Sequence, residues 1–217
     1  MPGNLRLPQL GLELQPMRAT SIFLAAVFTA SLSLIAQSVT HPVVPVFAAV
    51  DPAASPTLPS ADDVMAQAKT RAASEHKSIL LVFSASWCGP CRMFEAFLKD
   101  PETGPIMDKY FVDARLDVGE KPGDPRHSNS PGAEVLRASL KGADAGYPFI
   151  VMLNAEGQPI VNSFCPSGCT PPGENIGYPA TPGEIVWFMK MVHQAAPAIS
   201  AKEAKVIQAW LEKRGHA

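Results

Sequence analysis

Residues 79–91 read ILLVFSASWCGPC, and this stretch decides the fold of the chain. Its first six residues, 79–84, form a continuous apolar run of the length expected for a strand that is buried on both faces. A helix is predicted to follow over 88–99, where apolar residues recur at helical spacing. Two cysteines therefore stand where a buried strand passes into a helix.

A cysteine pair at such a junction suits thiol chemistry. The thiolate, rather than the thiol, attacks disulfides. Cys88 is predicted to lie at a helix N-terminus, where free backbone N–H groups and the helix dipole favour negative charge. Pro90 is tolerated in the first helical turn because no N–H is needed there. The spacing puts Cys91 within reach of Cys88, so we expect Cys88 to attack a substrate disulfide and Cys91 to resolve the mixed disulfide.

The motif Trp87-Cys88-Gly89-Pro90-Cys91 between a strand and a helix resembles the active site of the thioredoxin family. Cys-x-x-Cys alone is a weak signal, because zinc sites use it too. Further along, Gly146-Tyr147-Pro148-Phe149 opens a strand where thioredoxins carry their cis-proline. The resemblance covers about Ser60 to Ala196 and implies an α/β thioredoxin fold with thiol–disulfide oxidoreductase activity.

The resemblance also assigns roles to residues around the cysteines. It implies that Pro148, in cis, leaves the backbone of Tyr147 open for strand-like pairing with a substrate peptide. Gly-Pro between the cysteines resembles the reducing members of the family and favours a reductase. No cofactor and no metal are expected. The implied catalytic residues are Cys88 and Cys91, and the implied substrate-binding residues are Trp87, Gly89, Pro90, Tyr147 and Pro148.

Two other interpretations of the Cys88–Cys91 pair are a permanent disulfide and half of a zinc site. The chain has no second Cys-x-x-Cys and no His-x-x-x-His to complete a zinc set. It also departs from thioredoxin itself, since Val82 stands where thioredoxin has a buried acid, and the proton acceptor for the second cysteine is unidentified. Glu95 is a candidate, although its helical position favours a solvent-exposed residue. The departures indicate a specialised relative.

A second pair, Cys165 and Cys169, lies in a loop with the sequence CPSGC. Three interpretations are open. The pair is a structural disulfide of an oxidising compartment, a redox partner that exchanges with Cys88 and Cys91, or a soft-metal site for Cu(I). The alternative functions are accordingly a Cu(I)-binding chaperone that uses Cys165 and Cys169, or an interaction module whose cysteines do not catalyse a reaction.

The remaining sequence predicts alternating helices and strands. The order favours a central mixed sheet with helices on both faces and an extra C-terminal helix. Capping signals at Ser60, Thr181 and Ser200 mark three helix starts. Helices are expected over 61–76, 133–141, 181–196 and 200–215, with a short helix or turn over 101–110. Strands are expected over 79–84, 111–118, 149–153 and 159–164. An exposed loop is expected over 119–132 and a Pro/Gly-rich loop over 165–180.

The N-terminal segment has the layout of an export signal. Residues 1–48 carry only Arg6, Glu13 and Arg18 as charges, and 19–36 is an apolar run directly after Arg18. Val46-Phe47-Ala48 suits cleavage. The competing interpretation is an uncleaved membrane anchor, since a span needs roughly 17–25 apolar residues. We expect 1–48 to be a signal or anchor with an extension before Met17, 49–59 a Pro/Ala-rich linker, and 60–217 an exported domain.

Composition and net charge limit the classes of protein to which this chain can belong and the partners that it can bind. The 217 residues have a formal net charge of −2, which argues against nucleic-acid binding through bulk positive charge. A hydrophobic content of 47% excludes a disordered chain, and four cysteines are too few for a disulfide-scaffold miniprotein. The expected partners are a protein substrate with a disulfide and an electron donor that is exported or membrane-bound.

Overall fold

The computed structural model describes residues 58–124, 127–169 and 171–214. The predicted signal or anchor over 19–36 and the linker up to residue 57 lie outside the described residues. In the described part of the chain, no helix is long and apolar enough to cross a membrane.

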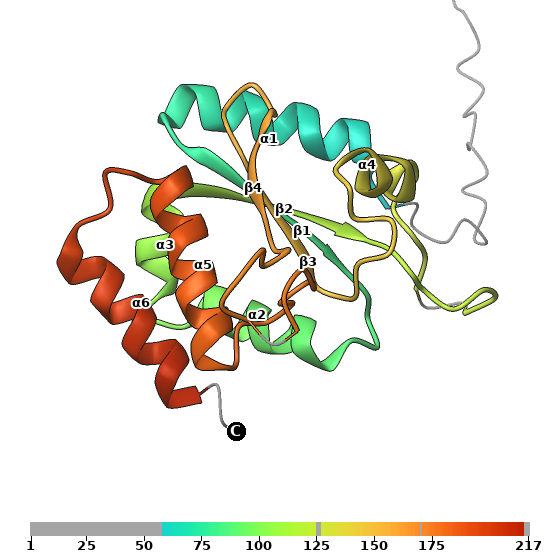
Figure 1. Ribbon diagram of the computed structural model, residues 1–217. Helices are drawn as coiled ribbons and strands as arrows, with labels where there is room; N and C mark the ends of the chain where they lie inside the picture. The colour runs from blue at the N-terminus through green and yellow to red at the C-terminus, as the bar shows by residue number, and fades with distance from the viewer. Residues whose placement is uncertain (1–57, 125–126, 170, 215–217) are drawn as a thin grey trace, which may run out of the picture. The chain divides into compact units, whose positions relative to one another are not determined.

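Four strands form one mixed sheet in the order β2-β1-β3-β4 (Figure 1). The central strand β1 is parallel to β2 and antiparallel to β3, and β3 is antiparallel to β4. Two neighbours therefore satisfy the backbone of β1 along both edges. The strands are β1 (Ser78–Ser84), β2 (Phe111–Asp117), β3 (Phe149–Leu153) and β4 (Pro159–Asn162).

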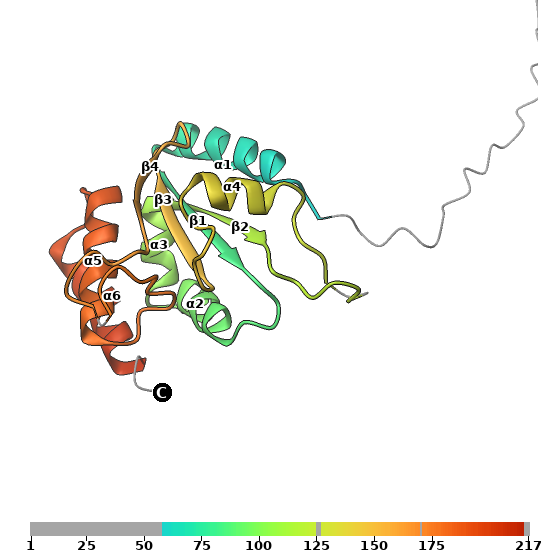
Figure 2. The ribbon, with the colours of Figure 1, turned by 45° about the vertical axis from the view of Figure 1, so that its right-hand side comes forward.

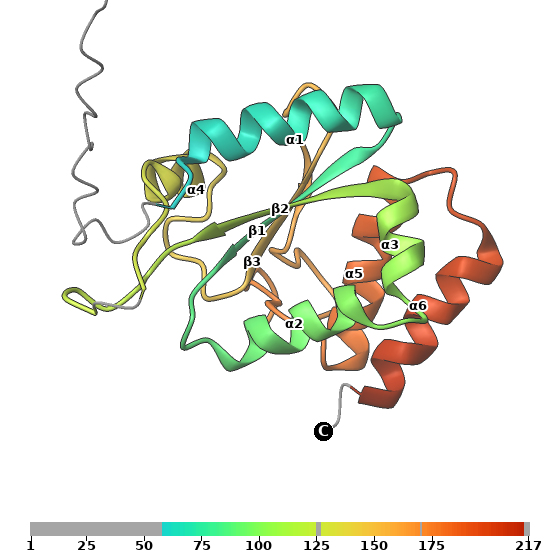
Figure 3. The ribbon, with the colours of Figure 1, turned by 180° about the vertical axis from the view of Figure 1, so that it is seen from behind.

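Helices cover both faces of this sheet, as Figures 1 and 3 show from opposite sides. One face carries α1 and α4, and the other carries the remaining helices. The predicted mixed sheet between two helical layers, with an additional C-terminal helix, is confirmed. The helices are α1 (Ala61–Glu75), α2 (Gly89–Lys99), α3 (Gly104–Tyr110), α4 (Ala133–Ser139), α5 (Pro182–Ala195) and α6 (Ala201–Arg214).

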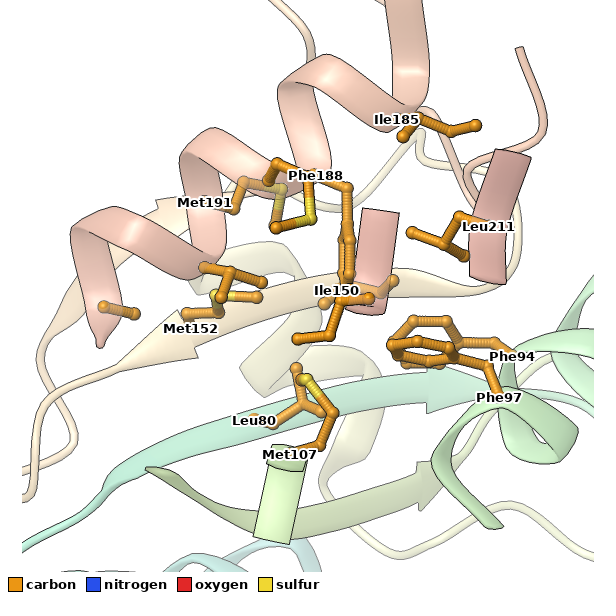
Figure 4. Close-up of a cluster of buried hydrophobic side chains, with 14 of the residues drawn as sticks. Leu80, Phe94, Phe97, Met107, Ile150, Met152, Ile185, Phe188, Met191 and Leu211 are labelled. Atoms are coloured by element: carbon orange, nitrogen blue, oxygen red, sulfur yellow. The ribbon is translucent and has the colours of Figure 1, made fainter. Parts of the chain in front are cut away.

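The continuous apolar run of β1 is explained by burial on both faces. Successive side chains of a strand point to opposite sides. Leu80 and Val82 join the hydrophobic cluster under α2, α5 and α6, which Figure 4 shows in part. Ile79, Leu81 and Phe83 join the cluster under α1 and α4. The strand thereby fixes the place at which the chain leaves the sheet toward the cysteines.

Polar caps begin the helices where the sequence predicts them. Ser60 caps α1 through its side chain. At α5, the Glu184 carboxylate accepts the backbone N–H of Thr181 at 2.8 Å, and the Thr181 hydroxyl accepts the N–H of Glu184. Ser200 and Glu203 make the same reciprocal pair before α6. These bonds satisfy N–H groups that have no partner within the helix.

The C-terminal helix α6 packs on the domain. Its Trp210 ring lies 5.3 Å from the ring of Phe97 in α2, measured between centroids. The Glu203 carboxylate accepts hydrogen bonds from Lys109 Nζ at 2.7 Å and from the Tyr110 hydroxyl at 2.8 Å. These bonds, that of Lys109 above all, lower the pKa of Glu203 to about 2. Aromatic packing and a charged anchor both tie α6 to the α2–α3 layer.

Some predicted boundaries and exposures are wrong. β4 ends at Asn162, and Phe164 instead forms an isolated bridge with Asn175 in the following loop. The loop over 119–132 is not uniformly exposed, because Glu120 and Ser130 are buried. Ser130 pairs with the main chain of Asp117, donating its N–H to the Asp117 carbonyl at 2.8 Å. These two polar residues of the loop are buried because they form hydrogen bonds at the ends of strands, Glu120 with Ser86 after β1 and Ser130 with Asp117 of β2.

Replacing Phe97 with alanine tests the packing of α2 against α5 and α6. Phe97 is fully buried and contacts Phe94, Phe188 and Trp210. The Phe97→Ala change should lower the free energy of unfolding by about 3–5 kcal/mol, because it leaves a cavity between three helices. Urea denaturation of the oxidised full chain measures this loss.

Val135→Ala is the matched control for Phe97→Ala, since Val135 of α4 is 76% exposed. Its effect should stay within about 0.5 kcal/mol. A loss for Phe97→Ala no larger than that of the control would contradict the described packing of the three helices.

Candidate active site

The site begins at the N-terminus of α2, where Cys88 and Cys91 form a disulfide with an S–S distance of 2.04 Å. Cys88 is the N-cap residue, and its Sγ accepts the backbone N–H of Cys91 at 3.1 Å. The Cys88 N–H donates to the carbonyl of Ala85 at 3.1 Å, which closes a turn between β1 and α2. A reduced Cys88 would keep the N–H of Cys91 and the positive end of the helix dipole beside its sulfur. Both favour the thiolate form of Cys88.

Gly89 and Pro90 occupy the first turn of α2. Pro90 lacks an N–H, but at this position no intrahelical acceptor exists for one. A Cβ built on Gly89 would meet only the tip of the Arg92 side chain, at 3.9 Å. The residues between the cysteines therefore form the helix start while adding little bulk around Cys88.

Two aromatic side chains flank the disulfide. The Trp87 side chain is 51% exposed, and its ring meets the ring of Tyr147 edge-on with centroids 5.8 Å apart. Tyr147 also packs against the small cluster of Ala85, Cys88 and Cys91. Trp87 and Tyr147 thus form an apolar surface next to the sulfur atoms.

The segment around Pro148 is braced by a side chain from a distant loop. The Tyr147–Pro148 peptide bond is cis. Asn175 Nδ2 donates to the carbonyl of Gly146 at 2.8 Å and to the carbonyl of Pro148 at 3.1 Å, on either side of Tyr147. Within the described residues, neither the backbone N–H nor the carbonyl of Tyr147 forms a hydrogen bond. The segment is held in place while one residue keeps its main-chain groups available.

Sequence reasoning missed Asn175. It lies in the Pro/Gly-rich loop between β4 and α5, and an asparagine in such a loop has no local signal of its own. Its orientation depends on Ser163, whose hydroxyl donates to Asn175 Oδ1 at 2.6 Å and accepts the N–H of Ile150 of β3. Only the pairing of β3 and β4 brings these groups together.

The structure gives Glu95 other partners than the cysteines. Its carboxylate accepts from Lys99 at 2.6 Å and lies 3.1 Å from the Arg115 guanidinium. The hydrogen bond from Lys99, with that from Arg115, lowers the pKa of Glu95, which makes it a poorer proton acceptor. Burial raises the pKa of another carboxyl, Asp117, which pairs in register with Ser84 at the end of β1.

The second cysteine pair also forms a disulfide, between Cys165 and Cys169. Both cysteines are buried and belong to the hydrophobic cluster of α5 and α6, together with residues such as Ile185 and Phe188. Cys88 and Cys91 belong to a different, small cluster with Tyr147. Within the described residues, no group of three or more His, Cys, Asp or Glu is placed to hold a metal ion.

Comparison with known proteins agrees with this geometry. Residues 61–155 match a family model described as thioredoxin-like. This chain contains a thioredoxin-like domain. The match runs from α1 through β3 and includes the Cys88–Cys91 pair, Tyr147 and Pro148. The observed strand order and helical layers are those of the predicted thioredoxin fold.

Solved structures similar to the thioredoxin-like domain include a disulphide isomerase from Xylella fastidiosa Temecula1, with 21% identity over 68% of this chain and 86% of that one, and a TM-score of 0.38. A thioredoxin-fold protein from Helicobacter pylori has 18% identity over 63% and 83%, with a TM-score of 0.36. The C-terminal domain of DsbD from Neisseria meningitidis has 22% identity over 49% and 86%, with a TM-score of 0.34. The search of curated proteins found no match.

A thioredoxin-like fold with a Cys-Gly-Pro-Cys disulfide at the start of α2 supports thiol–disulfide oxidoreductase chemistry. Trp87 and Tyr147 lie beside this disulfide, and Pro148 directly follows Tyr147. Gly89 and Pro90 lie between the two cysteines that the disulfide joins. It does not place Cys165 and Cys169 in the same cluster.

Replacing Glu95 with glutamine tests whether this carboxylate takes the proton of Cys91. Because Lys99 and Arg115 already engage it, Glu95→Gln should change the rate of disulfide reduction by less than about twofold and leave its pH profile in place. The rate of a reduced full-length chain with a model disulfide between pH 5 and 9 measures this. A tenfold loss with a displaced pH midpoint would show that Glu95 takes the proton after all.

Proposed function

We propose that this thioredoxin-like domain is an exported oxidoreductase that reduces disulfides in proteins. The observation that carries the proposal is the Cys88–Cys91 disulfide at the N-terminus of α2, with Cys88 Sγ accepting the N–H of Cys91. A cysteine with such a donor is the natural nucleophile of the pair, and Cys91, inside the helix, is the resolving cysteine.

The reaction transfers two electrons from the cysteine pair to the substrate. The Cys88 thiolate attacks one sulfur of a substrate disulfide, forms a mixed disulfide and releases the other substrate sulfur as a thiolate, which takes up a proton. The Cys91 thiol loses its proton and attacks Cys88 Sγ. This step forms the Cys88–Cys91 disulfide and releases the second substrate thiol. A dithiol donor then reduces the pair again.

The direction of electron flow is inferred from the residues between the cysteines. The Gly-Pro pair resembles the reducing members of the family. One of these, thioredoxin, has a reduction potential of about −270 mV, whereas the periplasmic oxidant DsbA has one of about −120 mV. A reductase outside the cytoplasm needs an electron source, so we propose a donor that is exported or membrane-bound.

The geometry around Pro148 favours a polypeptide substrate. The N–H and carbonyl of Tyr147, which form no hydrogen bond with other described residues, offer the main-chain groups with which an extended peptide pairs. The exposed Trp87 ring beside Tyr147 offers apolar contact. We assign substrate binding to Trp87, Tyr147 and Pro148, together with Gly89 and Pro90, which add little bulk beside Cys88.

Export is proposed from the sequence. The apolar run over 19–36 directly after Arg18 is a secretory signal or an anchor that tethers the domain to a membrane. The Cys165–Cys169 disulfide is of the kind that persists in an oxidising compartment.

We propose a structural role for the Cys165–Cys169 disulfide. Both cysteines are buried, and main-chain hydrogen bonds join Cys165 to Glu174 and Gly173 within the loop. The same loop carries Asn175, which braces the Pro148 segment. As a disulfide, the pair offers no thiolate to Cu(I), so a copper chaperone is the less favoured function.

A Cys91→Ser variant tests the catalytic order. Without the resolving thiol, the mixed disulfide with Cys88 should persist, and non-reducing electrophoresis with mass spectrometry should find an adduct at Cys88 after incubation with a disulfide-bonded protein. The Cys88→Ser variant is the control and should trap about tenfold less, because the backbone N–H of Cys91 and the start of α2 favour the thiolate of Cys88. Absence of any adduct would favour a non-catalytic interaction module.

The double variant Cys165→Ser/Cys169→Ser tests the second disulfide. Loss of a five-residue disulfide loop should lower the free energy of unfolding by about 2 kcal/mol, as loop-closure entropy predicts. The rate at which the Cys88–Cys91 pair reduces a small disulfide should stay within about twofold of the unaltered chain, because the pairs lie in separate clusters. A tenfold slower reaction without loss of stability would instead make Cys165 and Cys169 redox partners of the site.

A further inference from the structure

Two consecutive residues after β2, Gly119 and Glu120, hold the two residues that precede Cys88. The Glu120 side chain accepts hydrogen bonds from the backbone N–H of Ser86 and, at 2.7 Å, from the Ser86 hydroxyl. The carbonyl of Gly119 accepts the indole N–H of Trp87 at 2.9 Å. We call Gly119 and Glu120 the clamp. Figure 2 shows that the loop after β2 and the connection from β1 to α2 leave the same end of the sheet.

Glu120 is unusual for an acidic side chain because it is only 8% exposed. Removing a carboxylate from water is unfavourable unless hydrogen bonds replace the lost hydration. Here both bonds go to a single residue, Ser86, on the edge of the candidate site. The carbonyl of Ser86 is held as well, by Arg92 of α2 at 3.1 Å. The backbone directly before Trp87 is therefore fixed from two sides.

The clamp is itself anchored to the sheet. The N–H of Glu120 donates to Asn129 Oδ1 at 2.9 Å, which ties the start of the loop to its end. Ser130 returns the loop to Asp117 at the end of β2 through two hydrogen bonds. The clamp position thus follows from β2, which pairs with β1 along its whole length.

The clamp also shapes the surface beside it. Gly119 has a φ of +66°, and a Cβ at this position would collide with the hydroxyl end of the Tyr147 ring. The missing side chain lets Tyr147 lie against the Gly119 backbone, while the Gly119 carbonyl orients the Trp87 indole. One residue thereby positions both rings of the apolar surface.

We propose that the clamp is a positioning element that holds Trp87 against Tyr147 as a docking surface for polypeptide disulfides, and so makes the site prefer protein disulfides to small ones. This inference rests on the proposed function. A small disulfide needs only the sulfur of Cys88. A polypeptide also needs the aromatic surface, which the clamp orients, beside the Tyr147 main chain, which Asn175 braces.

The test compares two substrates on pre-reduced full-length chains. The probes are insulin, as a disulfide-bonded polypeptide, and bis(2-hydroxyethyl) disulfide, as a small disulfide. Acid quench and mass tagging measure the oxidation of Cys88 over time. Glu120→Ala should lower the second-order rate constant for insulin about tenfold, the size expected for losing hydrogen bonds to a charged group, and that for the small disulfide less than about twofold.

Matched variants separate position from charge. Glu120→Gln keeps an oxygen for the Ser86 N–H and an amide that donates to the Ser86 hydroxyl, so it should restore at least about half of the insulin rate. Lys121→Ala, an exposed neighbour in the same loop, should leave both rates unchanged. Trp87→Phe keeps a ring but loses the N–H bonded to Gly119, and should lower the insulin rate alone by about threefold. The Trp87→Phe variant therefore tests the clamp even if the Glu120→Ala variant fails to fold.

Two outcomes would overturn the proposal. If Glu120→Ala and Trp87→Phe lower the rate constants for insulin and for the small disulfide equally, the clamp acts on Cys88 itself. If the rate constant for insulin is unchanged in both variants, the clamp positions nothing that the substrate uses. An unaltered chain that reacts with neither probe would contradict the proposed function. The clamp proposal fails alone when that chain reacts with both and the variants show no selectivity.

Discussion

The burial of β1 on both faces is the constraint on which the rest of the structure depends. Its neighbours β2 and β3 occupy both edges, and hydrophobic clusters cover both faces. The strand has no freedom to slip, because a shift by one residue would exchange the side chains of its two faces. The chain therefore leaves the sheet at a fixed point, and the turn from Ala85 to Cys88 places the first cysteine at the start of α2.

Loops complete the site, and polar side chains hold them there. Glu120, from the loop after β2, fixes Ser86 on one side of the cysteines. Asn175, from the loop after β4, spans the carbonyls of Gly146 and Pro148 on the other. Each is positioned by a strand of the same sheet. A rigid scaffold that presents functional groups on braced loops is a common arrangement in enzymes.

Much of the fold is predictable because its signals are local. The apolar run of β1, the caps at Ser60 and Thr181 and the Cys88–Cys91 motif each depend on residues within a short stretch. The bracing residues are different. Nothing near Glu120 in the sequence indicates burial, since its partner Ser86 is 34 positions away. Asn175 likewise reaches the Pro148 segment through Ser163, Gly146 and Pro148, which lie 12 to 29 positions away. Such polar contacts appear only once the strands are paired.

The central claim is that Cys88 and Cys91 form a redox-active pair rather than a permanent disulfide. Its most direct test is a redox titration of the full chain in glutathione and dithiothreitol buffers, with each cysteine identified by mass tagging. We predict reversible reduction of this pair with a midpoint of about −270 mV, in the range of reducing members of the family, while Cys165 and Cys169 stay oxidised to lower potentials. A Cys88–Cys91 pair that stays oxidised below about −350 mV would behave as a structural disulfide, whose potential typically lies below about −300 mV, and would contradict the account.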